Sequence, residues 1–190
     1  MFTLAYVFLH GLGQNALAWD KVQSHFPGAI CPDLAQCPDY PSLYQTLSAQ
    51  LQCVPNPLYL CGLSLGGVLA LDFTLKNPDR VRSLVLIGAQ YKMPKTLLSL
   101  QNAVLRLMGR REMVRMCNSM KHLDFSAELG RISCPVLVVC GEKDKSNRKA
   151  AQELNYRLIH GKLEVVERAG HEVNVDAPEA LAKILRRFWG

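Results

Sequence analysis

Short apolar runs without polar alternation are the feature that most restricts the fold of this chain. Runs such as "PLYLC" and "VLVVC" must be buried on both faces, because a strand with one wet face alternates apolar and polar residues. Segments with helical periodicity, among them "ALAWDKVQSHF" and "RKAAQELNYRL", separate these runs. Buried strands that alternate with helices form a parallel sheet covered on both sides. We therefore predict a doubly wound α/β fold with a mainly parallel sheet of about six strands.

The boundaries of the expected elements follow from the same patterns and from the Pro and Gly residues between them. We expect strands at residues 3–9, 28–34, 57–62, 81–89, 135–141 and 162–168. We expect helices at residues 16–26, 42–52, 64–77, 148–158 and 178–188, and an irregular helical stretch at about 94–121. No segment has the composition of an interdomain linker, so we interpret residues 1–190 as a single domain.

The composition excludes several classes of protein. Apolar residues make up 49% of the chain and charged residues 20%, which is typical of a globular protein and not of a disordered one. No apolar run approaches the roughly 20 residues that span a bilayer, and the N-terminal run lacks the charge and cleavage site of a signal peptide. The 7 cysteines have no CxxC spacing, which is typical of buried thiols in a reducing compartment. We expect a cytoplasmic protein.

The charged residues and the histidines indicate neither nucleic-acid binding nor a metal site. The formal net charge is +6, but the basic residues are scattered and belong to no nucleic-acid-binding motif. The histidines show no ligand spacing, and "HEVNV" lacks the second histidine of a zinc-binding HExxH motif. We expect no metal and no cofactor.

The stretch "GLSLGG", residues 62–67, places a lone serine between glycines where an expected strand passes into an expected helix. Serine and glycine favour neither element, so local stability does not explain the choice. A GxSxG pattern between strand and helix is typical of a nucleophile elbow, a sharp turn that presents the serine hydroxyl above the sheet. The free N–H groups at the start of the helix then point toward the same place, where they suit an anionic intermediate. Ser64 is the candidate nucleophile.

A base and an acid for this serine occur at the ends of later strands. A serine hydroxyl is activated when a histidine, itself held by a carboxylate, takes its proton. Asp144 lies just past the strand in "VLVVCGEKD", and His171 lies in the loop after the last strand. Because the carboxyl ends of parallel strands share one edge of the sheet, we predict that Ser64, Asp144 and His171 form a catalytic triad. Glu142 is the alternative acid.

Two backbone amides are predicted to bind the oxyanion. The first belongs to Leu65, the residue after the nucleophile. The second belongs to Leu12 in the loop "HGLGQ" that follows the first strand, where glycines let the backbone bend inward. We expect His10 to orient this loop through a hydrogen bond without titrating in catalysis.

The same loop also fits a different function. "GLGQNA", residues 11–16, matches the glycine pattern of a dinucleotide-binding turn, and Asp33 ends the next expected strand at a suitable distance. This alternative leaves Ser64, Asp144 and His171 unexplained. It is therefore the weaker interpretation.

Together these motifs resemble the α/β-hydrolase superfamily over almost the whole chain. "HGLGQNALAW" and "GLSLGG" are similar to the pimeloyl-ACP methyl ester esterase group. "GEKDKSNRKAAQEL" and "ERAGHEVNVDAPEAL" are similar to the SHCHC synthases of menaquinone biosynthesis, which are lyases on the same scaffold. The resemblance implies the fold and the triad, and it leaves the substrate open. From the ordered residues at the strand ends we predict a serine hydrolase, a carboxylesterase or thioesterase that takes a small to medium acyl ester. The alternatives are such a lyase and a slow-turnover ligand receptor.

This sequence departs from the family pattern in three ways. It begins at the strand that carries the "HG" loop, without the two strands that usually precede it, and its lid is shortened to about residues 91–133. The lyases carry an arginine after the "GG" of the elbow, where this chain has Val68. A lid arginine would have to replace it, and the candidates are Arg106, Arg110, Arg111 and Arg115. An apolar lid set could line an acyl pocket: Leu97, Leu98, Leu105, Met108, Met113 and Met116.

Overall fold

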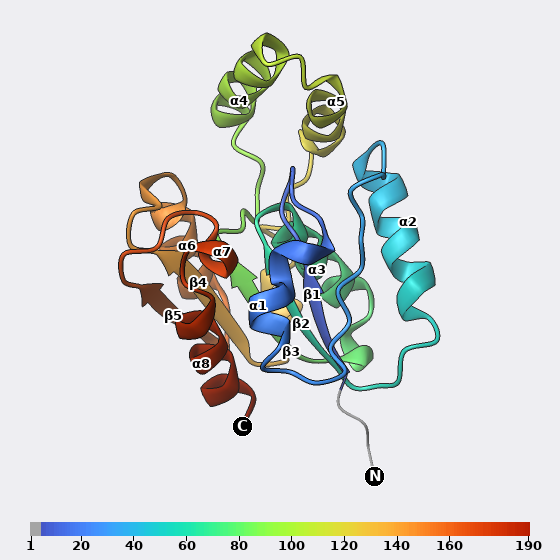
Figure 1. The fold of residues 1–190 in the computed structure, drawn as a ribbon, viewed down its shortest axis with the longest axis vertical. Coiled ribbons are helices and arrows are strands. Elements are labelled where there is room, and N and C mark those ends of the chain that lie inside the picture. The colour runs from blue at the N-terminus through green and yellow to red at the C-terminus, as the bar shows by residue number, and fades with distance from the viewer. Residues whose placement is uncertain (1–4) are drawn as a thin grey trace.

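A five-stranded, fully parallel sheet runs through the centre of the computed structural model, which describes residues 5–190 (Figure 1). Its strands lie side by side in chain order: β1 (Ala5–Leu9), β2 (Leu58–Leu63), β3 (Val81–Ile87), β4 (Val136–Gly141) and β5 (Gly161–Val166). Residues 3 and 4, the start of the first predicted strand, lie outside the described residues.

The sheet has one strand fewer than we predicted, because the segment at residues 28–34 does not form a strand. Ile30 alone pairs with β1: its N–H donates to Tyr6 (2.8 Å), and its carbonyl accepts from Phe8 (2.9 Å). Pro32 follows two residues later and has no N–H with which to continue the ladder. Since Ile30 and β2 lie on opposite sides of β1, the chain still reverses its winding direction at β1, which confirms the doubly wound topology.

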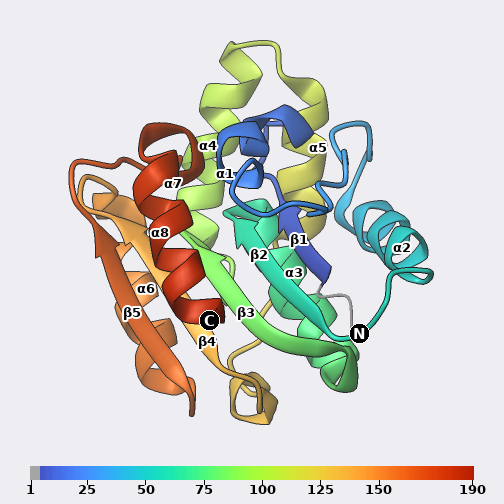
Figure 2. The same ribbon diagram turned by 60° about the horizontal axis from the view of Figure 1, so that its bottom comes forward.

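Helices cover both faces of the sheet (Figure 2). One face carries α2 (Tyr40–Leu51), α3 (Leu65–Lys76) and α6 (Lys145–Arg157). The other carries α1 (Asp20–Gln23), α7 (Val173–Asp176) and α8 (Pro178–Trp189). Short 3-10 turns occupy Ala16–Trp19, Pro78–Arg80 and Leu129–Arg131. Successive residues of one strand enter opposite layers: Leu84 and Leu86 pack under α3, whereas Val85 and Ile87 pack under α8. This two-sided burial explains why the strands read as unbroken apolar runs.

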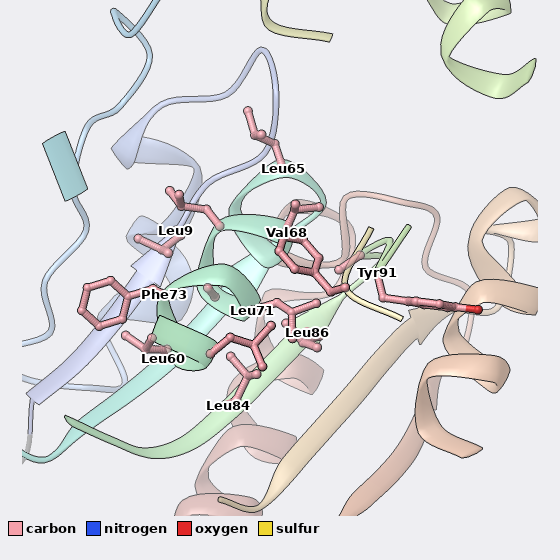
Figure 3. Close-up of a cluster of buried hydrophobic side chains, with 14 of the residues drawn as sticks. Leu9, Leu60, Leu65, Val68, Leu71, Phe73, Leu84, Leu86 and Tyr91 are labelled. Atoms are coloured by element: carbon pink, nitrogen blue, oxygen red, sulfur yellow. The ribbon is translucent and has the colours of Figure 1, made fainter. Parts of the chain in front are cut away.

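The helix α3 is apolar nearly all round and lies in the middle of the larger core cluster (Figure 3). Leu71 and Phe73 on this helix join Leu60 and Leu84 from the sheet, and all four side chains are almost completely buried. Full burial of one such side chain contributes about 1.5–3 kcal/mol. The residue at the start of α3, Ser64, is therefore held on a rigid support.

Two helices between β3 and β4 stand beyond the carboxyl edge of the sheet (Figure 1). These are α4 (Lys95–Leu107) and α5 (Arg111–Met120), which we call the helical hairpin. The Asn102 and Asn118 side chains join them through a hydrogen bond of 2.9 Å. At the base of the insertion, Lys92 and Asp124 pair through an isolated bridge and an ion pair of 2.9 Å. Within residues 5–190, no helix is both long and apolar enough to cross a bilayer.

Candidate active site

Ser64 lies at the turn between β2 and α3 in a backbone conformation that favours glycine. Its φ is 52° and its ψ is −112°, and such a conformation costs a non-glycine residue about 1–3 kcal/mol. The turn is fixed from both sides, because the Ser64 N–H donates to Ile87 (2.8 Å) and its carbonyl accepts from Val68 (3.0 Å). The side chain makes no capping hydrogen bond to its own helix. The hydroxyl is thus available for other partners.

The glycines that flank Ser64 are required by close backbone approach. A Cβ atom on Gly62 would collide with the carbonyl of Gly66. A Cβ atom on Gly66 would collide with the carbonyl of Leu9 at the end of β1. β1, β2 and α3 can therefore meet around Ser64 only because both side chains are absent.

Asp144 and His171 form a direct hydrogen bond across the ends of β4 and β5. The distance between His171 Nδ1 and Asp144 Oδ2 is 2.7 Å. The Asp144 side chain is 4% exposed, whereas the His171 side chain is 40% exposed. Since an ionised carboxylate only accepts hydrogen bonds, Nδ1 carries the proton and Nε2 is left as the acceptor. The pair has the tautomer that a general base needs.

The environment shifts the pKa values of both groups in the direction that favours an ion pair. Burial disfavours the charged form of Asp144, but hydrogen bonds from His171 and Asn147 outweigh it and hold the pKa of this carboxyl below 3.8. The hydrogen bond to Asp144 raises the pKa of His171 above 6.5, although partial burial opposes it. The negative charges of Asp144 and Glu172 add to that increase. A proton taken up by His171 is therefore stabilised.

Asn147 and Gln90 extend this pair, and neither residue was predicted from the sequence. Asn147 Nδ2 lies 2.9 Å from each carboxylate oxygen of Asp144, and its N–H backbone group also donates to Oδ1 (3.3 Å) at the start of α6. Gln90, just past β3, donates from Nε2 to Asn147 Oδ1 (2.7 Å). Both side chains line the cavity described next. Aspartate is a common N-cap residue whose carboxylate accepts from the backbone N–H two or three positions later, so the sequence alone does not reveal the second contact made by the Asn147 side chain.

A cavity of about 490 Å³ brings the three predicted triad residues together, and we call it the serine cavity. Ser64, Asp144 and His171 all line it. Much of the remaining lining is apolar and includes Val68, Met93, Leu98, Leu100, Val104, Leu105, Cys117 and Met120. Among the described residues no arginine or lysine lines it. Of the four lid arginines, Arg115 pairs instead with Asp39 (3.2 Å).

A smaller cavity of about 230 Å³ adjoins the loop after β1. Leu12 and Leu65 line both this cavity and the serine cavity, so these residues stand between the two. Met113 and Met116 of the expected acyl set line the smaller cavity, whereas Leu98 and Leu105 line the serine cavity. Met108 is exposed, and the side chain of Leu97 lies outside the described part of the structure.

The loop after β1 is held by its own side chains. His10 is buried: its Nδ1 donates to the Gly11 carbonyl (3.0 Å), and its Nε2 accepts from Leu34 (3.0 Å). Gln14 Oε1 accepts from the Gly11 N–H (3.1 Å), and a short 3-10 turn and the four-residue helix α1 follow. A dinucleotide-binding turn needs free amides and a long helix at this point, so the geometry disfavours that alternative.

The alternative acid, Glu142, is engaged elsewhere. Its Oε2 accepts a hydrogen bond from the Arg168 backbone (2.8 Å), on the exposed side of the loop after β5. Asp144 is the carboxylate that contacts His171.

Comparisons with known proteins identify the family and the fold of this chain. Residues 6–119 match the model of the alpha/beta hydrolase family. The pimeloyl-[acyl-carrier protein] methyl ester esterase of Aromatoleum aromaticum is 33% identical over 89 residues, which are 43% of this chain and 36% of that protein. A Bacillus subtilis protein described as a candidate 2-succinyl-6-hydroxy-2,4-cyclohexadiene-1-carboxylate synthase is 39% identical over 57 residues, 30% of this chain and 21% of that protein. These matches span about a third or less of the length of the curated relatives.

Solved structures extend the similarity of the fold to the whole chain. A thermophilic esterase from Thermogutta terrifontis superposes with a TM-score of 0.85 at 18% identity and covers 98% of this chain and 89% of its own. MenH from S. aureus superposes with a TM-score of 0.81 at 14% identity and covers 97% of this chain and 92% of its own. The elbow at Ser64, the parallel sheet and the matched family model lead to one conclusion: this chain belongs to the alpha/beta hydrolase family.

Proposed function

We propose that this protein is a serine hydrolase, a carboxylesterase or thioesterase that cleaves a small to medium acyl ester through Ser64, His171 and Asp144. One observation carries the proposal. The hydrogen-bonded pair of Asp144 and His171 lines the same cavity as Ser64, a serine with a strained backbone whose hydroxyl makes no capping hydrogen bond. Backbone strain, a shifted pKa and a cavity at one place are the combination typical of an active site.

The proposed reaction has two halves. The Ser64 hydroxyl oxygen attacks the ester carbonyl carbon while His171 Nε2 takes its proton, and Asp144 stabilises the imidazolium that forms. The proton then passes from His171 to the leaving alcohol or thiol, and an acyl-enzyme remains. Water, deprotonated by the same imidazole, attacks this acyl-enzyme and releases the acid. Each half passes through a tetrahedral oxyanion.

The amides of Leu12 and Leu65 are the proposed donors to that oxyanion. Both residues border the serine cavity, and Leu65 begins α3, so its N–H belongs to the unpaired first turn of a helix. Within residues 5–190, and outside the regular bonds of helices and strands, no backbone oxygen accepts a hydrogen bond from the N–H of Leu12 or of Leu65. One such donor contributes about 3 kcal/mol to lowering the barrier.

The lining of the serine cavity favours a neutral acyl group. Val68 and apolar side chains from α4 and α5 dominate the lining. Among the described residues, no arginine or lysine lines the cavity to bind a carboxylate on the acyl chain. The volume lies within the range of roughly 300–1,000 Å³ that holds small molecules. Esters with an uncharged acyl chain should therefore react faster than esters whose acyl chain carries a free carboxylate.

Hydrolysis of p-nitrophenyl butyrate tests the proposal, with Ser64→Ala compared with Ser146→Ala. Ser146 lines the same cavity and serves as the matched control. We expect Ser64→Ala to lower kcat by on the order of 10⁶ and to abolish labelling by a fluorophosphonate, while Ser146→Ala keeps both. Equal rates for wild type and Ser64→Ala would refute the proposed nucleophile.

A lyase reaction of the SHCHC synthase type is the second candidate, because a relative named for that reaction matches part of the chain. Such an enzyme would need a cation for the substrate carboxylate, and Val68 and the cavity lining supply none among the described residues. The hydrolase is therefore favoured. Turnover of the synthase substrate without ester hydrolysis would reverse this order, and a single stoichiometric acylation would favour a receptor.

A further inference from the structure

The hairpin exposes a continuous apolar stripe that the serine cavity only partly accounts for. Its residues follow helical spacing along one side of α4 and onto its end, and they are Leu100 (66% exposed), Val104 (48%), Leu107 (90%) and Met108 (62%). Positions separated by three or four residues lie on one side of a helix, so these side chains form one surface. We call it the hairpin stripe. Water covers it in the isolated chain, which is unfavourable for so many large apolar groups.

The end of the stripe is an ordered turn. Gly109 has a φ of 70°, its N–H donates to Arg106 (3.0 Å), and the Arg110 N–H donates to Leu105 (2.8 Å). This pair of bonds is a Schellman motif, which ends α4 in a fixed geometry. Leu107 and Met108 are thus exposed at the turn that ends α4. The connection between α4 and α5, which we call the hairpin tip, lies at the far end of the helical hairpin from the sheet (Figure 1).

Positive charge surrounds the stripe. Residues 95–121 contain 6 basic side chains and 1 acidic one, which gives this segment +5 of the chain's formal net charge of +6. Five of the basic side chains carry no ion pair among the described residues, and all six are exposed: Lys95, Arg106, Arg110, Arg111, Arg115 and Lys121. Three of them, Arg106, Arg110 and Arg111, lie at the tip itself. Exposed leucines next to a cluster of arginines suit a surface that is apolar within and anionic at its boundary.

We propose that the hairpin tip docks on an anionic lipid bilayer, with Leu107 and Met108 inserted at the headgroup boundary and the tip arginines paired with lipid phosphates. A bilayer is favoured over an acidic protein because Leu107 and Met108 are largely exposed at the outermost turn of the hairpin and the exposed tip arginines adjoin them, whereas a protein partner would bury them in a complementary groove. Leu100 and Val104 belong both to the stripe and to the wall of the serine cavity. Docking therefore sets the cavity beside the lipid surface.

Sedimentation with vesicles tests this inference without reference to catalysis, so it is measured on Ser64→Ala as well as on the wild-type chain. With equimolar phosphatidylglycerol and phosphatidylcholine we expect binding, and with phosphatidylcholine alone we expect none. Leu107→Glu should weaken binding about tenfold or more, because a charge at the inserted position opposes burial. Reversing the three tip arginines to Glu should weaken it more than about a hundredfold, at about fivefold per side chain.

Matched control variants distinguish an effect of the hairpin tip from a general effect of exposed apolar residues or of net charge. Tyr156→Glu changes an equally exposed apolar residue on α6 (90%), and Lys162→Glu with Lys183→Glu changes exposed charges on β5 and α8. These variants should bind as the wild type does. In addition, Leu107→Trp fluorescence should shift to the blue on anionic vesicles, and Tyr156→Trp fluorescence should not.

Several results would overturn the inference. Absence of binding to the anionic vesicles refutes it, and so does equal loss of binding in the control variants. A concentration-dependent dimer that Leu107→Glu dissociates, together with no vesicle binding, would assign the stripe to a second copy of the chain. Capture by a purified acidic protein, but not by lipid, would assign it to a protein partner.

Discussion

His171 packs against Gly88 so closely that a Cβ atom at Gly88 would lie 2.9 Å from both Cε1 and Nδ1 of the imidazole. Gly88 directly follows β3 and has a φ of 54°. The end of β3 thus forms one wall of the space that holds the ring. The orientation of the imidazole depends on this glycine as well as on the bond to Asp144.

We predict that Gly88→Ala abolishes the proposed ester hydrolysis beyond its effect on stability. The positive φ alone should reduce the free energy of unfolding by about 1 kcal/mol, and the contact with the ring should move His171 away from its working position. Gly28→Ala is the matched control, because Gly28 has a φ of 79° and no atom within 4 Å of the added Cβ. Urea denaturation should give similar losses for both variants, while ester hydrolysis should fall only in Gly88→Ala. Similar activity in the two variants would contradict the proposed wall.

The acidic limb of the pH profile should report the pKa of His171. The base must be neutral to accept the serine proton, so kcat/KM should rise with pH and reach half its maximum above pH 6.5. Asp144→Asn removes the hydrogen bond that raises this pKa, so the limb should move to lower pH. Its kcat should also fall by roughly 10⁴, because the tautomer is no longer fixed.

Glu172→Gln is the control for that pH experiment, since the charge of Glu172 raises the pKa of His171 and its side chain makes no hydrogen bond to the ring among the described residues. We expect a small shift of the limb to lower pH and an unchanged kcat at high pH. A limb that stays in place in Asp144→Asn would show that another group controls the profile.

Local patterns in the sequence were enough to place all five strands of the sheet, the turn at Ser64 and the order of Ser64, Asp144 and His171 along the chain. They also predict that the three residues lie at the same edge of the sheet, because the carboxyl ends of parallel strands lie on the same side. A strand was predicted around Ile30, but only Ile30 itself pairs with β1. Its apolar run resembles those of the true strands, and only Pro32 limits the pairing. Exposure of Leu107 was equally hidden, because an apolar residue on a helix is usually buried.

Contacts between distant side chains are the part that sequence patterns did not reveal. Gln90 and Asn147 are 57 positions apart, and their hydrogen bond depends on how the segment after β3 meets the start of α6. The approach of Gly88 to His171 has the same origin. Such contacts are set by tertiary packing, and helix and strand periodicity carries no information about it.

Asn147 should act as a positioning residue for Asp144. Asn147→Ala removes the donor to both carboxylate oxygens, so we expect kcat to fall about tenfold, which corresponds to ~1.4 kcal/mol of barrier. Asn147→Asp should be worse, because a second negative charge then faces the carboxylate. Lys149→Ala on the exposed side of α6 should leave kcat unchanged.

A double-mutant cycle tests whether Gln90 works through Asn147. Gln90→Ala should lower kcat by less than Asn147→Ala, since Gln90 donates to Asn147 Oδ1 and so orients its amide. The double variant should be no slower than Asn147→Ala alone. Fully additive losses would mean that the two side chains act independently.

The strain at Ser64 gives a prediction about stability that separates function from folding. Both Ser64→Ala and Ser64→Gly remove the nucleophile, but only glycine relieves a φ of 52°. We expect Ser64→Gly to unfold at higher urea than Ser64→Ala, with a difference in the free energy of unfolding of about 1 kcal/mol. Ser83, buried in β3, is the control, and there glycine should be less stable than alanine by about 0.5–1 kcal/mol. If glycine destabilised both positions equally, the elbow would hold no strain, and the geometry that exposes the hydroxyl would need no support from the surrounding core.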